Sequence, residues 1–420
     1  MPTAKLHHRV RTVPTPRRFH FFQPSLAASS FLLLLATFGC HRSRFPDVPV
    51  GYREFAYISN GKSNTVTVLD LVYLRQDRTL QVGTNPSGLA VNPVRNELYV
   101  VNTGSGSISV ISAELNRVVA TIPVHRLPRS IAVDATGRHA YVANSGSNTV
   151  STLDLDRLRE TGTAGTGEQP GLVRISPDGR TLVVTNAGSG SVSIFSIAPS
   201  DPQTPRTVPP LHLRAAFPDC PGASDAAILP DSSKAFIACS DGHQVMVVSL
   251  AAAPGSWAAK QNPSLTTDHM LTLLDVGTTP IHLAMKPDGG EIFVSNFDSD
   301  SITEISTWTN EVGTTFAIGS KPAYGIVSGD NSMLWVSNFG ADSISLYSID
   351  DGRLVGSVHT GSAPEVLAFS ADEHLLLATD AHSGDVAVIR TQGNPGPALF
   401  TILPAGGSPN DIVVKALKQK

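Results

Sequence analysis

Short apolar runs with alternating small polar residues return at regular intervals along most of the chain. One run, 140–143, reads Ala-Tyr-Val-Ala and is followed by Asn144; related runs occur eight times, with Cys239 or Asp380 in the asparagine place in two of them. A proline, or once an alanine, opens another apolar run sixteen residues before the asparagine position in all seven measurable cases. This alternation, rich in β-branched residues, predicts short β-strands.

The repeat has a basic period of 42 residues, and each period contains four predicted strands. In one repeat the first three are 130–134, 140–143 and 149–153, and the short fourth corresponds to 118–122 of the repeat before it. A four-stranded unit that returns every 40–45 residues, roughly, is typical of a β-propeller blade, because a blade needs neighbours to cover both of its faces. We therefore predict an all-β fold with a single β-propeller of antiparallel blades over residues 55–416.

The repeats predict eight blades, with seven as the alternative if the unit at Cys239 or at Asp380 is not a full blade. The first hairpin, from Phe55, has no inner strand before it, whereas residues 409–416 form an inner strand with no hairpin after it. We expect these two segments to pair and close the ring, because an open ring would expose sheet edges.

The Tyr-Val-x-Asn cores, followed by Gly-Ser-(Gly/Asn)-(Ser/Thr)-(Ile/Val), resemble the YVTN family of β-propeller repeat proteins. The resemblance covers residues 55–416 and implies the propeller fold, but it implies little about function. The stretch 175–195 is also similar to the propeller lactonases that open 6-phosphogluconolactone. This second likeness extends only as far as the repeat itself.

The first 39 residues carry five Lys and Arg, no Asp or Glu, and an apolar run, 31–39, that ends at Cys40. This run is shorter than the roughly 20 residues that a membrane span requires, so it predicts an export signal. Because Gly39 precedes Cys40, the segment resembles a bacterial lipoprotein signal, in which the cysteine is lipidated and becomes the N-terminus. The alternative is ordinary signal cleavage without a lipid.

These segments predict four parts of the chain: a signal peptide at 1–39, a tether at 40–54, the propeller at 55–416 and a tail at 417–420. The expected location is the periplasm, the outer membrane or the cell surface of a bacterium. Contact with a membrane is expected only through the lipid anchor.

The charge balance of the chain excludes one class of binding partner. The formal net charge is −4, and without the basic N-terminus 26 Lys and Arg stand against 35 Asp and Glu. Such a surface lacks the basic patch that binding to phosphate backbones needs, so we expect no nucleic-acid partner. We expect a monomer.

Cys220 and Cys239 remain as a pair in an oxidising compartment if Cys40 carries a lipid. Cys220 lies in the loop that leads into the first strand of its blade, and Cys239 ends the second strand. Both positions fall at the same end of the blade. We predict a disulfide between them, with two buried free thiols as the alternative.

The lead-in loop before the first strand and the loop between the second and third strands emerge on one face, which we call the top face. Most lead-in loops have glycine three residues before the proline position: Gly83, Gly167, Gly277, Gly319, Gly361 and Gly406. We expect these glycines to adopt a positive φ in a tight turn. Insertions at 198–210 and 251–263 are expected on the opposite, bottom face.

The first strand of each blade lines the central channel, so its first residues at the channel mouth are candidates for ligand binding. When the repeats are aligned, most equivalent positions carry similar residues. The first positions of the inner strand vary instead, and they include Arg129, Asp225, His282, Tyr324, Glu365 and Asp411. Carboxylates and imidazole suit a divalent cation, and arginine suits an anionic ligand. The alternative is a water-filled channel that tolerates any polar residue.

The asparagine column is expected to be structural, because an asparagine side chain before a Gly/Ser turn can bond backbone amides and define the bend. Its members are Asn60, Asn102, Asn144, Asn186, Asn296 and Asn338. Two motifs are missing from the sequence. The lack of Cys-x-x-Cys-His excludes covalently attached c-type haem, and the lack of Gly-x-Ser-x-Gly excludes a serine-hydrolase elbow.

Two functions remain. The favoured one is an exported, lipid-anchored and non-catalytic scaffold that binds a protein, a glycan or a small molecule on the top face, with no cofactor. The other is a lactonase-like hydrolase, in which channel-mouth residues would hold a divalent cation that polarises the lactone carbonyl. Its candidate catalytic residues are Asp225, His282, Glu365 and Asp411.

Overall fold

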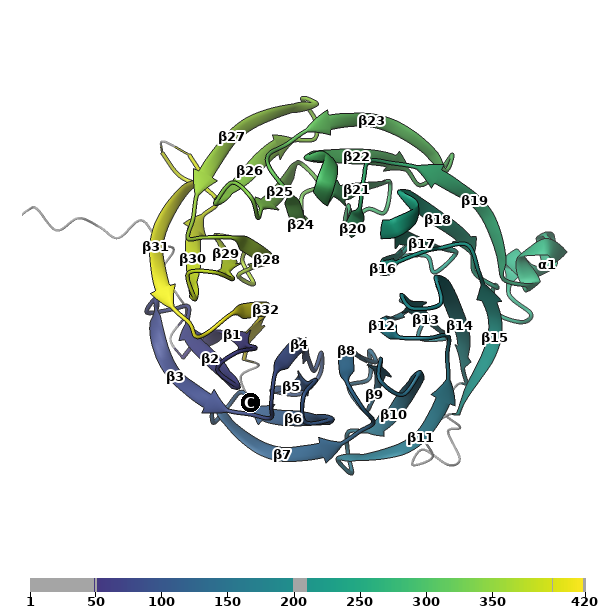
Figure 1. Cartoon of the computed structure of the whole chain (residues 1–420), viewed down its shortest axis with the longest axis horizontal. Coiled ribbons are helices and arrows are strands. Elements are labelled where there is room, and N and C mark those ends of the chain that lie inside the picture. Colours follow the sequence, from purple (N-terminus) through teal and green to yellow (C-terminus); the bar gives the residue numbers. More distant parts are fainter. Residues whose placement is uncertain (1–48, 50, 199–209, 395, 418–420) are drawn as a thin grey trace, which may run out of the picture. The chain divides into compact units, whose positions relative to one another are not determined.

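Eight four-stranded antiparallel sheets stand side by side around a central channel (Figure 1). This computed structural model describes residues 49, 51–198, 210–394 and 396–417. The predicted signal peptide, Cys40 and most of the tether lie outside the described residues, as does nearly all of the insertion at 198–210. The eight-bladed propeller is confirmed, and the seven-bladed alternative is wrong.

The blades are numbered in chain order, with their strands written from the channel outward. Blades 1 to 4 are β32 (Pro409–Ala416), β1 (Glu54–Asn60), β2 (Thr65–Asp70) and β3 (Arg75–Gln81); β4 (Pro86–Val91), β5 (Glu97–Asn102), β6 (Ser107–Ser112) and β7 (Arg117–Pro123); β8 (Pro128–Val133), β9 (His139–Asn144), β10 (Thr149–Asp154) and β11 (Arg159–Gly165); and β12 (Pro170–Ile175), β13 (Thr181–Asn186), β14 (Ser191–Ile197) and β15 (Leu211–Phe217).

The second half of the ring repeats this pattern. Blades 5 to 8 are β16 (Ala223–Ile228), β17 (Lys234–Cys239), β18 (Gln244–Ser249) and β19 (His269–Asp275); β20 (Pro280–Met285), β21 (Glu291–Asn296), β22 (Ser301–Ser306) and β23 (Glu311–Ala317); β24 (Pro322–Val327), β25 (Met333–Asn338), β26 (Ser343–Ser348) and β27 (Arg353–His359); and β28 (Pro364–Phe369), β29 (Leu375–Asp380), β30 (Asp385–Arg390) and β31 (Ala398–Pro404).

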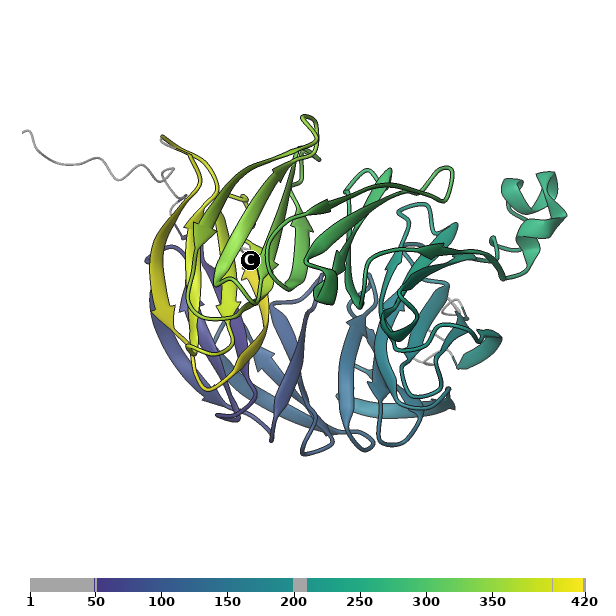
Figure 2. The same ribbon diagram turned by 45° about the horizontal axis from the view of Figure 1, so that its top comes forward.

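Short helices occur only in connections of the described chain. The α-helix α1 (Trp257–Gln261) and the 3-10 helix η2 (Pro263–Thr266) lie between β18 and β19, and α1 projects away from the blades (Figure 2). Two 3-10 turns, η1 (Ser240–Gly242) and η3 (Phe297–Ser299), follow the second strands of blades 5 and 6. Among the described residues, no helix is long and apolar enough to cross a membrane.

The two ends of the propeller close the ring within one sheet. β32 pairs antiparallel with β1, so that Glu54 lies opposite Ala416, as the unpaired terminal segments predict. Each blade then covers the face of the next. In one such interface Tyr99 and Ile108 of blade 2 pack against Ile131 of blade 3, and all three side chains are buried.

The constant sixteen-residue spacing has a structural cause. The proline that opens an inner strand pairs with the asparagine that ends the second strand, as Pro86 does with Asn102. Asn102 Nδ2 donates to the hydroxyls of Ser107 and Ser109 at 3.2 and 3.0 Å, while Asn102 Oδ1 accepts from the Gly83 amide at 3.1 Å. The other five asparagines make the same pair of hydroxyl contacts five and seven residues ahead.

The prediction of a positive φ at the lead-in glycines is wrong. The positive φ falls on the residue directly before the proline, for example Asn85 at 51°. That residue is held by its neighbours, because the Asn85 amide donates to Asn64 Oδ1 and its carbonyl accepts from the Thr103 amide. Glycine is required at 83 for space: a Cβ there would lie 2.6 Å from Asn102 Cγ.

Blade 5 replaces the glycine–asparagine contact with a covalent bond. The structure joins Cys220 and Cys239 by a disulfide, with their Cα atoms 4.8 Å apart. Cys220 stands at the lead-in glycine position and Cys239 at the asparagine position. The residues five and seven places after Cys239 are Gln244 and Met246, so the hydroxyl partners of the asparagine are also missing from this blade.

Candidate functional site at the channel mouth

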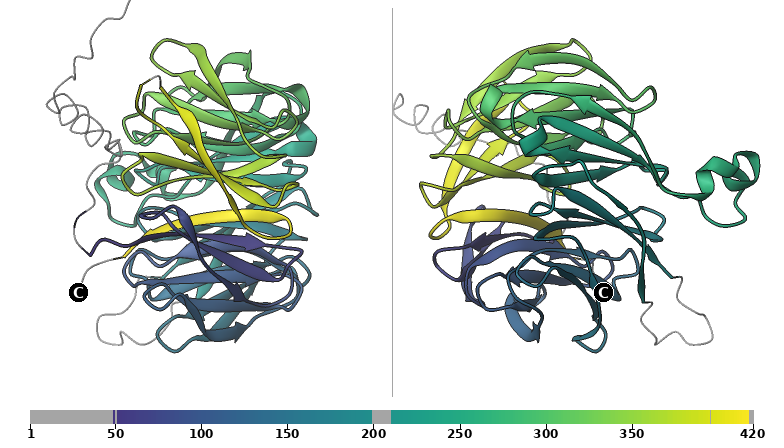
Figure 3. Two further views of the ribbon diagram at one scale, coloured as in Figure 1. Left: turned by 90° about the vertical axis from the view of Figure 1, so that its left-hand side faces the viewer. Right: turned by 45° about the vertical axis from the view of Figure 1, so that its right-hand side comes forward.

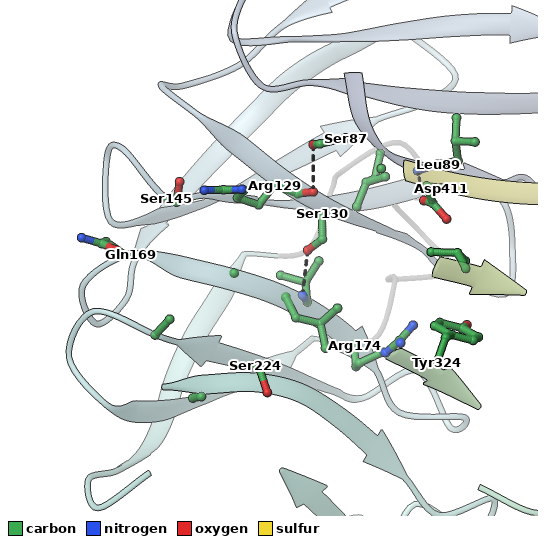
Figure 4. A pocket seen from close by; sticks show the side chains of 18 of the residues that line it. Ser87, Leu89, Arg129, Ser130, Ser145, Gln169, Arg174, Ser224, Tyr324 and Asp411 are labelled. Atoms are coloured by element: carbon green, nitrogen blue, oxygen red, sulfur yellow. Dashed lines mark hydrogen bonds between the residues drawn. The ribbon is translucent and has the colours of Figure 1, made fainter. Parts of the chain in front are cut away.

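A pocket of about 620 Å³ opens at the top of the central channel (Figure 4). Most of its walls come from the inner strands of blades 1 to 5. Its polar lining residues are Ser87, Arg129, Ser130, Ser145, Gln169, Arg174, Ser224, Tyr324 and Asp411. Each of these inner strands brings some of its first five residues to this pocket, because it runs from the top face along the channel wall.

Two arginines line the pocket at different depths. Arg129 is the second residue of β8, and Arg174 is the fifth residue of β12, which places Arg174 about 10 Å deeper at the ordinary rise of a strand. The Arg129 guanidinium has no hydrogen-bond or ion-pair partner among the described residues. Arg174 donates from Nε to the Ala226 carbonyl at 3.2 Å and lies 3.5 Å from Asp225 Oδ1.

Arg174 is absent from the residues predicted at the channel mouth, because the prediction stopped at the first residues of each inner strand. The signal was present in the sequence. The fifth position of the inner strand is alanine, isoleucine or valine in the seven other blades. A single arginine in an otherwise apolar column marks a side chain that the packing between blades does not require.

Asp225, His282 and Tyr324 form a connected group on three successive blades. His282 Nδ1 lies 2.9 Å from Asp225 Oδ2, and the His282 ring stacks on the Tyr324 ring with centroids 3.8 Å apart. Burial disfavours the charge of Asp225, but attraction to His282, the hydrogen bond from it and Arg174 outweigh burial and lower the pKa of Asp225 to about 2. Asp225 is therefore a carboxylate at neutral pH.

Both ring nitrogens of His282 face acceptors. Nδ1 faces the Asp225 carboxylate, and Nε2 lies 3.0 Å from the Gly325 carbonyl, which can only accept. Both ring nitrogens of His282 are therefore occupied by contacts within the protein.

The two aspartates at the third inner-strand position bridge neighbouring blades. Asp411 accepts from the Leu89 amide of blade 2 at 2.7 Å and from the Ile412 amide at 2.8 Å. Asp225 accepts in the same way from the Leu283 amide of blade 6 at 3.0 Å and from the Ala226 amide at 2.9 Å. These carboxylates satisfy backbone groups that would otherwise face the channel unpaired.

Asp411 differs from Asp225 in its charge state. Burial raises the pKa of Asp411 to about 7, and the nearby Glu365 adds to the rise, against the two backbone hydrogen bonds and Arg174. Asp225 has a histidine beside it, and Asp411 does not. The channel mouth thus holds one carboxylate that stays ionised and one that titrates near neutral pH.

Glu365 lines a different pocket from Arg129, Tyr324 and Asp411, and neither pocket is lined by Asp225 or His282. This groove of about 700 Å³ lies on the top face over blades 7, 8 and 1, and its lining includes Lys62, Phe339 and His382. Burial raises the pKa of the Glu365 carboxyl. Within the described chain, no group of three or more His, Cys, Asp or Glu side chains is placed to hold a metal ion. Asp225 and His282 are in contact, but the four predicted cation ligands do not meet at one site.

The family described as "Lactonase, 7-bladed beta-propeller" matches residues 48–173, 128–218 and 304–402. These ranges cover more than half of the chain, and the unmatched segment contains blade 5 with its disulfide. Among curated proteins, none matches the sequence.

Several solved structures share the fold. They include dihydro-heme d1 dehydrogenase NirN in complex with DHE (TM-score 0.67, 15% identity, 89% of this chain and 77% of that chain), a Bacteroides uniformis protein proposed to be a 6-phosphogluconolactonase (0.58, 17%, 87% and 99%) and Kuenenia stuttgartiensis hydrazine synthase (0.51, 21%, 70% and 91%). At these identities the likeness shows the fold alone.

Three observations indicate the same family: the YVTN-like repeats, the ring of four-stranded blades and the extent of the family match. The family description counts seven blades, and this ring has eight. The chain belongs to the lactonase family of β-propellers, as a member with one additional blade.

Proposed function

We propose that this protein is an exported β-propeller, held at a membrane by a lipid on Cys40, that binds a small anionic molecule in the channel-mouth pocket without transforming it. The observation that carries the proposal is the presence of Arg129 and Arg174 in one pocket. Guanidinium groups bind carboxylates and phosphates through paired hydrogen bonds, and a partly enclosed channel strengthens this attraction.

Hydroxyl groups between the two arginines support an anionic ligand. Ser130 Oγ accepts from the Val173 amide at 3.0 Å, which leaves the Ser130 hydroxyl proton available to a ligand (Figure 4). Asp225 contributes indirectly, since it lies beside Arg174 and also contacts His282. Its contacts with Asp225 and the Ala226 carbonyl therefore hold Arg174 in position in the pocket.

The same contacts favour binding over catalysis. Asp225 and His282 are bonded to each other and to backbone groups, and a general base needs an uncommitted lone pair. These residues hold the shape of the site. The predicted binding of a protein or a glycan on the top face has no equally specific set of residues in the described chain.

Titration calorimetry with citrate, inorganic phosphate and 6-phosphogluconate as probes tests the binding proposal. We expect at least one probe to bind, with Arg129→Ala and Arg174→Ala each weakening its affinity about tenfold or more. Arg159→Ala, which removes an exposed arginine from outer strand β11, is the matched control and should leave the affinity unchanged. Binding that is insensitive to both pocket variants would exclude this site.

The anchor is tested separately. Metabolic labelling with a radioactive fatty acid should label the wild-type chain and not the Cys40→Ser variant. The support for this step is the sequence from Phe31 to Cys40, with its apolar run and the small residue before the cysteine. An unlabelled wild-type chain in the soluble periplasmic fraction would show ordinary export without a lipid.

Lactone hydrolysis is the second candidate, because the chain belongs to the lactonase family. The group best suited to activate water is Asp411, whose pKa of about 7 lies near the operating pH of a general base. Arg174, which interacts electrostatically with Asp411, would stabilise negative charge on the lactone oxygen. Opening of 6-phosphogluconolactone that is lost in Asp411→Asn but retained in Arg159→Ala would favour this function.

A further inference from the structure

Two of the three tryptophans of the chain are almost fully exposed. The exposed fraction is 77% for Trp257 and 85% for Trp308, whereas Trp335 is buried at 3%. Tryptophan is among the most buried residues on average, because the transfer of its large apolar ring out of water is favourable. Two such rings on one surface therefore indicate a contact that the isolated propeller does not supply.

Both tryptophans lie in connections that leave the bottom of neighbouring blades, and α1 reaches beyond the outer strands (Figure 1). Trp308 is in the turn from β22 to β23, and Trp257 begins α1 in the connection from β18 to β19, which Figure 3 shows reaching away from the blades. Across the ring, the corresponding turns of blades 1 and 2 expose Tyr73 at 71% and Leu115 at 51%. Large apolar side chains thus project from opposite sides of the same face.

The described chain enters the propeller on this face as well. β1 begins with Glu54 at the bottom of blade 1, because it runs toward the top loop that follows Asn60. Pro49 lies nine positions after Cys40, and a chain of this length spans at most about 30 Å when fully extended. A lipid on Cys40 would therefore hold the bottom face close to a bilayer, a step that rests on the anchor in the proposed function.

We propose that the bottom face docks on the bilayer surface, with Trp257 and Trp308 inserted at the level of the lipid headgroups and Tyr73 and Leu115 in contact on the other side. Tryptophan and tyrosine are suited to this boundary, since their rings are apolar and each carries one polar group. In this orientation the channel-mouth pocket faces away from the membrane and stays open to solvent.

The charges of the bottom face determine which lipids fit. Exposed arginines flank the start of the propeller at Arg53, Arg75 and Arg117. Acidic turns occur on several other blades, at Asp178, Asp288, Asp330, Asp350 and Asp372. Because the two signs are mixed, attraction to anionic lipid is not the driving force. The proposal is therefore specific to insertion of aromatic rings into a zwitterionic surface, with binding that changes little with salt.

Fluorescence quenching tests the docking. The full chain, purified in its lipidated form, is mixed with phosphatidylethanolamine-rich vesicles that carry bromine on the acyl chains near the headgroup. We expect quenching of Trp257 and Trp308 that persists at high salt. The double variant Trp257→Ala, Trp308→Ala should retain only the unquenched signal of buried Trp335, with an unchanged Tm because neither ring packs in the core.

The outcomes separate docking from anchoring. Lipidated protein that binds the vesicles without quenching of Trp257 or Trp308 overturns the docking and leaves the anchor intact. The Cys40→Ser chain at high vesicle concentration tests the face without the lipid, and there the double tryptophan variant should bind about tenfold more weakly. Equal vesicle binding of the Cys40→Ser chain with and without both tryptophans also overturns the proposal.

Discussion

Residues that depart from the repeat carry the most information about this molecule. Asp380 stands in the asparagine column, and Asp385 stands where six of the other blades have serine or threonine. Asp380 Oδ2 accepts from the Gly361 amide at 3.1 Å, as Asn102 Oδ1 does from Gly83, so the carboxyl imitates the amide. Burial and the hydrogen bond to Asp385 raise the pKa of Asp380 to about 8.

This pair makes stability depend on pH. The pKa of Asp380 is higher in the folded state than the value of about 3.9 expected when unfolded, so the folded state retains a proton that the unfolded state has lost. The stabilisation is complete below pH 4 and is lost as the pH rises through 8. We expect the free energy of unfolding of Asp380→Asn, measured by urea denaturation, to exceed that of wild type by about 2 kcal/mol at pH 9. Near pH 4 the two free energies of unfolding should be equal. Equal pH profiles for the two proteins would contradict a shared proton.

The sequence allowed the channel-mouth residues to be located but not assigned a role. Asp225 and His282 were predicted as ligands because their side chains suit cations, and the contacts between blades that occupy them arise only when strands far apart in sequence become neighbours. Glu365 lines a separate pocket on the top face. A repeat fixes the register of each strand, whereas the pairing of side chains across blades depends on the tertiary structure.

At the scale of the element, the contact between the lead-in glycine and the asparagine holds a hairpin where its inner strand begins. Gly83→Ala would place a Cβ 2.6 Å from Asn102 Cγ, and Asn102 is fixed by two hydroxyl contacts. We expect this change to lower the free energy of unfolding by about 2–3 kcal/mol. Gly162→Ala on outer strand β11 has nothing within 4 Å of its Cβ and should cost almost nothing. Similar losses of unfolding free energy in the two variants would show that space beside Asn102 is not limiting.

In blade 5 the disulfide takes the place of the glycine–asparagine contact. Cys220 and Cys239 are 19 residues apart, and a bond across a loop of this size stabilises a protein by about 3 kcal/mol. The double variant Cys220→Ser, Cys239→Ser should unfold at a lower temperature in calorimetry. The loss is not compensated, because Gln244 and Met246 offer no hydroxyl network in place of the bond. A reducing agent should therefore lower the Tm of wild type toward that of the variant. The Tm of the variant should not change, because the variant has no bond here to reduce.

At the scale of the molecule, the 42-residue period predicts the ring and the constant spacing predicts the blade number, because each repeat pairs locally in the same register. The lead-in glycines show the limit of this reasoning. Their conservation across repeats suggested backbone conformation, whereas the structure shows a steric requirement set by another strand. Local pairing follows from sequence, and the cause of a conserved position depends on what packs against it.

Ring closure leads to the last prediction. β32 completes blade 1, and its Asp411 also bonds the Leu89 amide of blade 2, so the C-terminal strand joins two blades. Deletion of residues 409–420 would expose the edge of β1 and leave that amide unpaired. We expect the truncated chain to aggregate or to unfold without a cooperative transition.

A circular permutant provides the control. Residues 409–417, placed before Arg53 through a short turn, restore β32 to the same sheet, since Ala416 already lies opposite Glu54. This chain should fold cooperatively with all four strands of blade 1 in sequence order, although the ring is then closed only by contacts between blades 1 and 8. We therefore expect faster unfolding than in the natural chain, measured by stopped-flow in urea. A permutant that unfolds at the natural rate would show that joining both chain ends in one sheet adds no kinetic stability.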